Sequence, residues 1–512
     1  MKKAINTIQK TISIISAYGI AFFLFISTGG AWTNDANINL GLSDIIWRLL
    51  IITILASFIL LFMRESLEGL MSKYTSYNIL VFALCCITYL YQFRGDIYEF
   101  FNWFCLPILW FFLFLLLTGD VNIVWKAFVN VAILFSIISL FYYFFGTCIK
   151  LIPESGITEI YWGEWDTSAI RSFHNLYYEA QFLKTDGIRI IARNCGIFSE
   201  APMYNFVLCV AMSIELFISK HTHWWKIILL FLTIITTFST TGYLFLIIAG
   251  VMYLANIIFS ESGLTVHKIA FNIVTLLGGL IVIGILIQKM STISGAGSVN
   301  VRSDHLIACI KAWINSPIIG VGYENQSAIM EYEKYKQGIS VGLPYLLATG
   351  GILMISMIAI PFIKIIKESA SKRTFNILIF ESLFLILYFF TAITYFPILR
   401  FFIAYILTVN VDDNLPCHKI DKFQRLIINK LLTITYTMDE FKSYIKSKKI
   451  VIITTGVILS IIFCVIRFIK REFWSIQTCI YALIVFISGF LLCIFFYYLL
   501  LFKPTFKHKE KS

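Results

Sequence analysis

The chain has 512 residues, of which 59% are hydrophobic and only 14% are charged. A soluble protein of this length carries about a quarter charged residues, so this composition excludes a single soluble core and indicates lipid as the solvent. The net charge of +12 does not indicate nucleic acid binding, because the lysines cluster between apolar segments, as membrane orientation requires. The 11 cysteines form no CxxC motif and no Cys/His ligand spacing, so we expect no metal site and no cofactor.

Apolar runs of about 20 residues recur along most of the chain, which is the pattern of membrane-spanning helices. We therefore predict an all-α polytopic membrane protein with about 12–14 transmembrane helices. The first apolar segment is long and lacks a small-residue cleavage site, so we interpret it as a retained helix. The spans are expected at roughly 12–30, 44–63, 77–93, 97–118, 122–146, 201–219, 224–240, 241–259, 266–288, 343–366, 375–395, 397–410, 449–468 and 476–501.

The lysines and arginines of the short loops predict the orientation of these spans. When both termini are placed in the cytoplasm, most of this positive charge lies inside; the exceptions are Arg94 and the cluster at 467–471. Two long loops then lie outside, and we expect both to carry short helices. The chain divides into N-terminal spans (1–146), a first exterior loop (147–200), central spans (201–289), a second exterior loop (290–342), further spans (343–410), a basic cytoplasmic segment (411–448) and a C-terminal pair of spans with a basic tail (449–512).

The first exterior loop offers aromatic and basic side chains. Trp162 and Trp165 lie among acidic residues, a combination that suits sugar rings, although interfacial anchoring explains such tryptophans equally well. Arg189 and Arg193 are four residues apart and would share one face of a helix. Their guanidinium groups suit phosphate oxygens or a salt bridge to a nearby acid. Glu200 comes just before the next span, where the helix dipole favours a carboxylate.

The second exterior loop contains an amphipathic segment from Ser303 to Asn315. Its apolar residues recur at i, i+1, i+4, i+7 and i+8, which predicts a surface helix capped by Ser303. Pro317 and the glycines after it predict a chain reversal. Arg302, Asp304 and His305 stand at the exposed start of this helix, where they would either position an anion and a general base or simply be solvated.

Four short motifs occur in order around the two loops. They are the run from Arg193 to Pro202 (RNCGIFSEAP), the turn STTGY at 239–243, the pair of Arg302 with PIIGVG at 317–322, and the span entry LPYLLATGGI at 343–352. Together with the expected topology, they resemble the bacterial O-antigen polymerase and O-antigen ligase superfamily. The resemblance covers roughly residues 40–410.

The resemblance implies a glycosyltransferase in the bacterial cytoplasmic (inner) membrane that acts on its outer face. Such an enzyme takes glycan from an undecaprenyl-diphosphate carrier and transfers it to a lipid-linked repeat unit of O-antigen, capsule or exopolysaccharide. By motif position, Arg193 and Arg302 resemble the diphosphate-binding residues, with Arg189 as a neighbour. The base candidates are Glu200, Asp304 and His305, in no order. The implied partners are the lipid-linked oligosaccharide, membrane lipid, a flippase and a chain-length regulator, with no nucleic acid.

Two alternatives stay open. Ligase-like members of the superfamily carry a His-Asn pair just before the span entry, where this chain reads ISVGL at 339–343, and they tend to have Ser-Arg where this chain has Thr240-Thr241. Both departures favour a polymerase over a ligase. A flippase or transporter would place ionisable residues mid-membrane on facing helices, whereas most such residues here lie near span ends.

Overall fold

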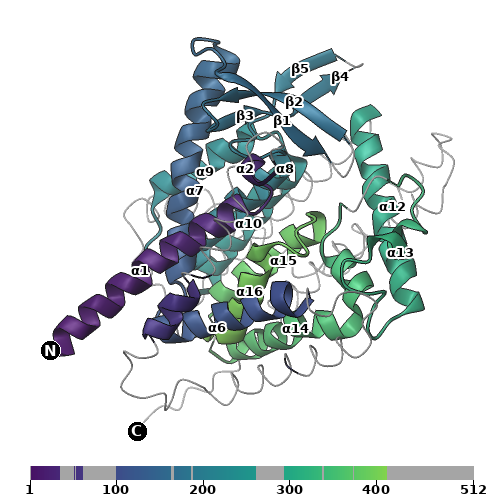
Figure 1. The fold of residues 1–512 in the computed structure, drawn as a ribbon. Helices are drawn as coiled ribbons and strands as arrows, with labels where there is room; N and C mark the ends of the chain where they lie inside the picture. Colours follow the sequence, from purple (N-terminus) through teal and green to yellow (C-terminus); the bar gives the residue numbers. More distant parts are fainter. Residues whose placement is uncertain are drawn as a thin grey trace, which may run out of the picture. The chain divides into compact units, whose positions relative to one another are not determined.

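The computed structural model describes residues 2–34, 51, 53–60, 83, 100–162, 166–185, 188–260, 293–336, 340–372 and 374–411 (Figure 1). These residues are mostly helical and belong to one compact unit, Met1–Lys419. Three of the described helices are long and apolar enough to cross a membrane, namely Asn6–Ile26, Ile123–Cys148 and Leu343–Lys372. They indicate membrane association. Several predicted segments lie outside the described residues, except for Ala83 and Val411. They are the expected spans at 77–93, 266–288, 449–468 and 476–501 and the basic segment 411–448.

Two of the long apolar helices run side by side in the same direction. They are α1 (Lys2–Ile26) and α7 (Ile123–Tyr142), which η2 (Tyr143–Cys148) extends as a π-helix. The Asn130 amide donates to the Tyr18 hydroxyl at 2.7 Å, and one to two turns further along both helices the rings of Phe25 and Phe135 stack with centroids 5.0 Å apart. Residue numbers therefore rise together along the pair.

The next three helices alternate in direction beside α7. They are α8 (Ala201–Phe217), α9 (Trp224–Thr236) and α10 (Thr240–Ser260). Tyr204, early in α8, bonds to Ser139 late in α7 at 2.8 Å, whereas Lys226, early in α9, donates to Asn130 at 2.9 Å. The starts of α8 and α10 and the end of α9 therefore lie at the same end of α7. Only Thr237–Ser239 separate α9 from α10, so the STTGY motif at 239–243 begins in a tight turn between two helices.

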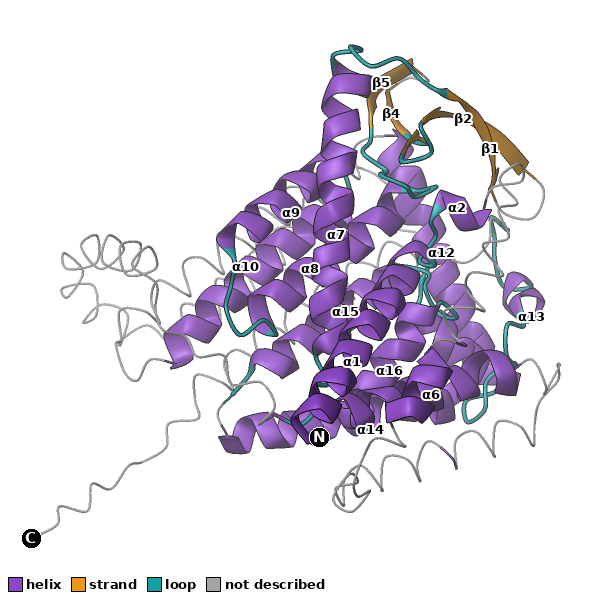
Figure 2. Ribbon diagram, turned by 60° about the vertical axis from the view of Figure 1, so that its left-hand side comes forward, coloured by secondary structure: helices purple, strands orange, loops and turns teal. Residues whose placement is uncertain are grey.

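A second group of helices contains α6 (Leu106–Thr118), preceded by η1 (Phe100–Cys105), together with α14 (Leu343–Lys372), α15 (Asn376–Phe390) and α16 (Pro397–Thr408). Figure 2 shows α1, α6, α14 and α16 along one side of the bundle. Helix α14 is interrupted at Gly351, whose φ of 59° lies in the left-handed region. The loop before α14 fills this break: Val321 and Gly322 donate to the carbonyls of Ala348 and Thr349, and the amides of 352–353 donate back to the loop. The interrupted backbone is thus satisfied inside the protein, as membrane depth demands.

The first loop differs from our expectation, because it carries strands and not short helices. One antiparallel sheet consists of β1 (Gly156–Trp162), β2 (Asp166–Phe173) and β3 (Tyr177–Glu179). A separate hairpin consists of β4 (Phe182–Thr185) and β5 (Ile188–Ala192). The short helix α2 (Ala31–Asn34), which follows α1, packs against this region. The segment alternates with a period of two, so that Thr158 and Ile160 are buried while Ile157 is exposed. This alternation, together with β-branched and aromatic residues, favours strands. Both figures show the strands gathered beyond the η2 end of α7.

The second loop contains the predicted amphipathic helix, but the helix is longer and is oriented differently. Helix α12 spans Ile293–Asn315, so Ser303 lies inside it and does not cap it. Its buried face consists of Asp304, His305, Ala308, Cys309 and Ala312, whereas Ile314 is 62% exposed. The small residues let α12 approach the protein closely, whereas Ile310 and Ile314 are exposed and the other large apolar residues are half-buried. The short helix α13 (Gln326–Met330) follows, capped by Asn325.

Candidate active site

Arg193 is held in place just beyond the end of β5. Its Nε donates to the carbonyl of Thr237 at 2.9 Å, in the turn between α9 and α10, and its Nη1 donates to Oε1 of Gln181 at 3.0 Å. The backbone amide of Arg193 also donates to the Gln181 carbonyl. These bonds fix the guanidinium from two directions. Burial lowers the pKa of Arg193, and the charges of Cys195 and Glu200 oppose that change.

Glu200 occupies the N-cap position of α8 with an extended backbone. The same Gln181 oxygen that accepts from Arg193 also accepts from the amide of Ala201 at 3.1 Å, so Gln181 ties the arginine to the start of α8. Burial raises the pKa of Glu200, and the positive charges of Arg193 and Arg302 oppose the rise. Glu200 thus lies in a largely dry environment close to two cations.

Arg302 brings the second loop to this cluster. It lies on α12, and its charge acts on Arg193, on Glu200 and on His305. Two guanidinium groups from different loops therefore flank one carboxylate. Such a pair repels itself unless an anion or a carboxylate neutralises it, and arginine forks match phosphate and carboxylate oxygens.

The STTGY turn adds a third element to the cluster. Tyr243 lies close enough to Arg193 to affect its pKa, and its hydroxyl donates to the carbonyl of Ile235 at 3.1 Å. Gly242 is required for this packing, because a Cβ at that position would lie 2.2 Å from Oδ1 of Asn205 on α8. The turn therefore supports Arg193 from behind with its Thr237 carbonyl and brings Tyr243 near it.

Asp304 and His305 are buried, which corrects our expectation that they stand at an exposed helix start; their residues are only 3% and 1% exposed. Oδ2 of Asp304 accepts from the amides of Lys334 and Tyr335 at 2.7 and 3.0 Å. Asp304 thereby anchors the segment after α13 to α12. Of the three base candidates, Asp304 is the one whose reactive oxygen already has two backbone partners.

His305 contacts two residues that the sequence did not single out. Its Nδ1 accepts from the amide of Ser340 at 3.0 Å and lies 2.8 Å from the Ser340 hydroxyl. Its Nε2 lies 4.0 Å from Oε2 of Glu333. Burial lowers the pKa of His305, the charge of Asp304 opposes this, and Arg302 lowers it further. Nothing local in the stretch EYEKYK around Glu333 distinguishes that carboxylate from Glu331; only the fold brings it to His305.

The remaining predicted residues are not brought into this cluster by any described contact. Arg189 lies on β5 opposite Lys184, so it does not share a helix face with Arg193, contrary to the prediction. Trp162 ends β1 and pairs with Asp166 on β2, and Trp165 lies outside the described residues. Within the described parts of the chain, no three His, Cys, Asp or Glu side chains are grouped so that they could hold a metal ion.

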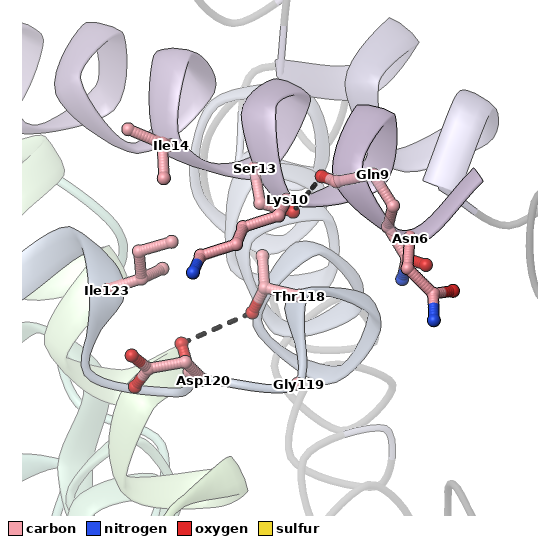
Figure 3. Close-up of a pocket in the computed structure, with 9 residues that line it drawn as sticks. All are labelled: Asn6, Gln9, Lys10, Ser13, Ile14, Thr118, Gly119, Asp120 and Ile123. Atoms are coloured by element: carbon pink, nitrogen blue, oxygen red, sulfur yellow. Dashed lines mark hydrogen bonds between the residues drawn. The ribbon is translucent and has the colours of Figure 1, made fainter. Parts of the chain in front are cut away.

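A cavity of about 410 Å³ lies at the other end of α1 (Figure 3). It is lined by Asn6, Gln9, Lys10, Ser13, Ile14, Thr118, Gly119, Asp120 and Ile123. The opposite end of α1 leads directly to the motif around Arg193, because the amide of Ala31 donates to the carbonyl of Ile197 at 2.8 Å. The cavity extends along α1 as far as Ile14, and the helix continues to Ile26. About twelve helical residues, each rising about 1.5 Å, therefore separate the cavity from the end of α1 that leads to Arg193.

The comparisons with known proteins provide no independent assignment. No family model, no curated protein and no solved structure matches this chain. The site described above therefore has to be interpreted from its own geometry and from the motifs that build it.

Proposed function

We propose that this protein is a membrane glycosyltransferase of the polysaccharide polymerase type. It transfers glycan from an undecaprenyl-diphosphate-linked donor to a lipid-linked repeat unit on the outer face of the cytoplasmic membrane. The observation that carries this proposal is the convergence of Arg193 and Arg302, from two loops, on the partly buried Glu200.

The chemistry of the transfer matches that set of charges. The leaving group is a lipid diphosphate, which gains negative charge as the bond to the sugar breaks. Fixed guanidinium groups in a dry site stabilise such charge strongly, because they need no reorganisation when the reaction occurs. The hydrogen bonds to Gln181 and Thr237 hold Arg193 in advance. The acceptor hydroxyl needs a group that takes its proton, and both Glu200 and His305 lie within the same electrostatic cluster.

The directions of the helices support the placement of the proposed active site at one end of the helix bundle. The starts of α8 and α10 and the end of α9 lie at the η2 end of α7. At that end Arg193 bonds to Thr237 between α9 and α10. The cavity around Lys10 lies at the other end of α1. Under the predicted orientation, with the N-terminus in the cytoplasm, the end with Arg193 faces outward, where lipid-linked repeat units are polymerised.

Deletion of the gene followed by analysis of the cell's glycans tests the proposal. A polymerase mutant should leave single repeat units on the lipid carrier or the final acceptor. Long chains that persist but remain unattached would identify a ligase. Repeat units trapped inside the cell would identify a flippase or transporter.

A ligase of the same superfamily is the second candidate, and one observation favours it. The segment just before α14, where ligase-like members carry a histidine, holds Ser340 in this chain. The His305 imidazole is bonded to this residue from α12. The protein thus brings an imidazole to that segment from a different element, which offsets one of the two departures in its sequence.

A further inference from the structure

The bonding of His305 determines which of its nitrogens carries the proton. A backbone amide can only donate, so the bond from the Ser340 amide makes Nδ1 an acceptor. The neutral imidazole therefore carries its proton on Nε2, directed away from Ser340. Burial and the charge of Arg302 lower the pKa of His305 and favour this neutral form, although Asp304 acts in the opposite sense. The only lone pair of this imidazole, on Nδ1, is therefore directed at Ser340, whose amide and hydroxyl share it, and not at a substrate.

Glu333 lies on the Nε2 side of His305. Its side chain is fully buried, and among the described residues neither its carboxylate oxygens nor Nε2 of His305 has a hydrogen-bond partner. Oε2 of Glu333 and Nε2 of His305 face each other at 4.0 Å. Buried polar groups are almost always paired, so two such groups beside each other are an unusual arrangement. A closer approach of less than about 1 Å would bring them to the hydrogen-bond distance that proton exchange requires. Burial raises the pKa of Glu333, and the charge of Asp304 raises it further, which makes it a stronger base than a solvated carboxylate.

Ser340 is the partly exposed member of this series. Its hydroxyl lies 2.8 Å from Nδ1 of His305. It precedes α14, and His305 is one helical turn from Arg302, whose charge acts on both His305 and Glu200. Because it is partly exposed, Ser340 is the member of the series that an acceptor hydroxyl can reach.

We propose that Ser340, His305 and Glu333 form a proton relay, in which Ser340 contacts the acceptor hydroxyl and Glu333 finally holds its proton. This inference rests on the proposed glycosyl transfer. The acceptor oxygen bonds to the anomeric carbon, and the bond from that carbon to the diphosphate oxygen breaks, leaving its electron pair on the lipid diphosphate. The acceptor proton passes to Oγ of Ser340, the Ser340 proton passes to Nδ1, and the Nε2 proton passes to Glu333. The three transfers then run in reverse, from Glu333 to Nε2, from Nδ1 to Ser340 and from Ser340 to the departing diphosphate or to water, which restores the starting state.

Kinetics of reconstituted protein with a lipid-diphosphate-linked donor test the relay. Glu333→Gln should lower turnover by roughly 10²-fold, the size of a lost general base, with the KM for the donor unchanged. Glu333→Asp should restore part of the rate. Ser340→Ala should match Glu333→Gln, and Ser340→Thr, which keeps the hydroxyl, should recover. The matched control is Glu331→Gln, two residues away and exposed, which should behave as the wild type.

The pH profile separates a relay from mere structural support. Within the described residues, the charged or titratable groups that act on the pair are Arg302, Asp304 and Cys309, and all three are unchanged in Glu333→Gln. Loss of the acidic limb of the pH profile in this variant supports the relay. A Glu333→Gln enzyme with the turnover and pH profile of an active wild type overturns it.

Nitrogen NMR of His305 in the membrane-reconstituted protein gives a readout that needs no activity. The relay requires a proton on Nε2, none on Nδ1, and an Nε2 signal that shifts in Glu333→Gln. A proton on Nδ1, or a signal that does not respond to Glu333, overturns the relay whatever the reaction is. A wild-type protein that transfers no glycan refutes the proposed function and the role of the relay in it, and the NMR result then decides whether the pair exists.

Discussion

The two loops contribute to the site in opposite ways. In the first loop, the guanidinium of Arg193 is bonded to both Gln181 and Thr237. In the second loop, His305 and Glu333 face each other in a buried place with unpaired atoms. A group that stabilises charge works best when it is rigidly held in advance. A group that moves a proton needs a partner of comparable basicity, which burial provides.

The largest expected effect comes from removing either arginine. Arg193→Ala and Arg302→Ala should each reduce chain growth by at least roughly 10²-fold, because each removes a fixed cation from the developing diphosphate charge. Lysine at either position should restore only part of the activity, since it lacks the fork geometry. Glycan chain lengths on gels, together with the amount of protein in the membrane, give the measurement.

The matched control for the arginines is Arg171→Ala in the same loop. Arg171 is exposed and pairs with Glu154 at 3.0 Å on the sheet, so its removal should leave chain length unchanged. Normal chain lengths in both Arg193→Ala and Arg302→Ala would refute the diphosphate assignment.

The next effect tests how the second loop is held against α14. A Cβ at Gly320 would lie 2.3 Å from the backbone of Thr349, and one at Gly351 would lie 2.4 Å from the carbonyl of Ile318. Backbone cannot move aside as a flexible side chain can, so alanine at either position should cost roughly 1–3 kcal/mol of stability or more. Gly250→Ala on α10, where a Cβ meets no atom within 4 Å, should be neutral or slightly stabilising. Thermal unfolding in detergent measures all three; equal melting temperatures would contradict the interlocking of loop and helix.

A smaller effect is expected from Gln181→Ala. It removes the acceptor shared by Arg193 and the Ala201 amide, while the bond from Arg193 to Thr237 remains. We expect turnover to fall about tenfold, which corresponds to about 1.4 kcal/mol, the size of one hydrogen bond to a charged group. Transfer assays on reconstituted protein check this. A loss as large as that of Arg193→Ala would mean that Gln181 does more than hold the arginine.

The smallest effect concerns stability against pH in the second loop. Burial raises the pKa of Glu333, so the folded state binds its proton more tightly than the unfolded chain does. Stability therefore falls as the pH rises from the ordinary carboxyl range through the raised pKa. Glu333→Gln lacks this dependence and should be more stable by about 1 kcal/mol above that range, with no gain below it. Unfolding at several pH values measures this, and a gain that is constant with pH would contradict it.

The sequence predicted which segments form the site more accurately than it predicted which face of each segment is buried. The motif run from Arg193 to Glu200 and the residues Arg302 and His305 do come together. Of the predicted apolar face of α12, Ile310 and Ile314 are exposed and Leu306, Ile307 and Trp313 are only half-buried. Small residues, Asp304 and His305 form its buried face instead, because a close approach between backbones favours small side chains over large ones. In the first loop, the spacing of Arg189 and Arg193 is compatible with a helix, whereas the period-two pattern of 156–173 favours strands, and the structure follows the second pattern.

Composition and apolar periodicity alone determined that this is a helical membrane-associated chain, and motif order alone selected Arg193, Glu200 and Arg302. These properties are local, since hydrophobic runs and charge spacing can be read without knowing which segments meet. Only the tertiary structure decided that Asp304 anchors the segment after α13, that Glu333 lies behind His305, and that the glycines of 317–322 pack into the break at Gly351. Each depends on contacts between distant segments and on the direction of single side chains, which one sequence does not encode locally.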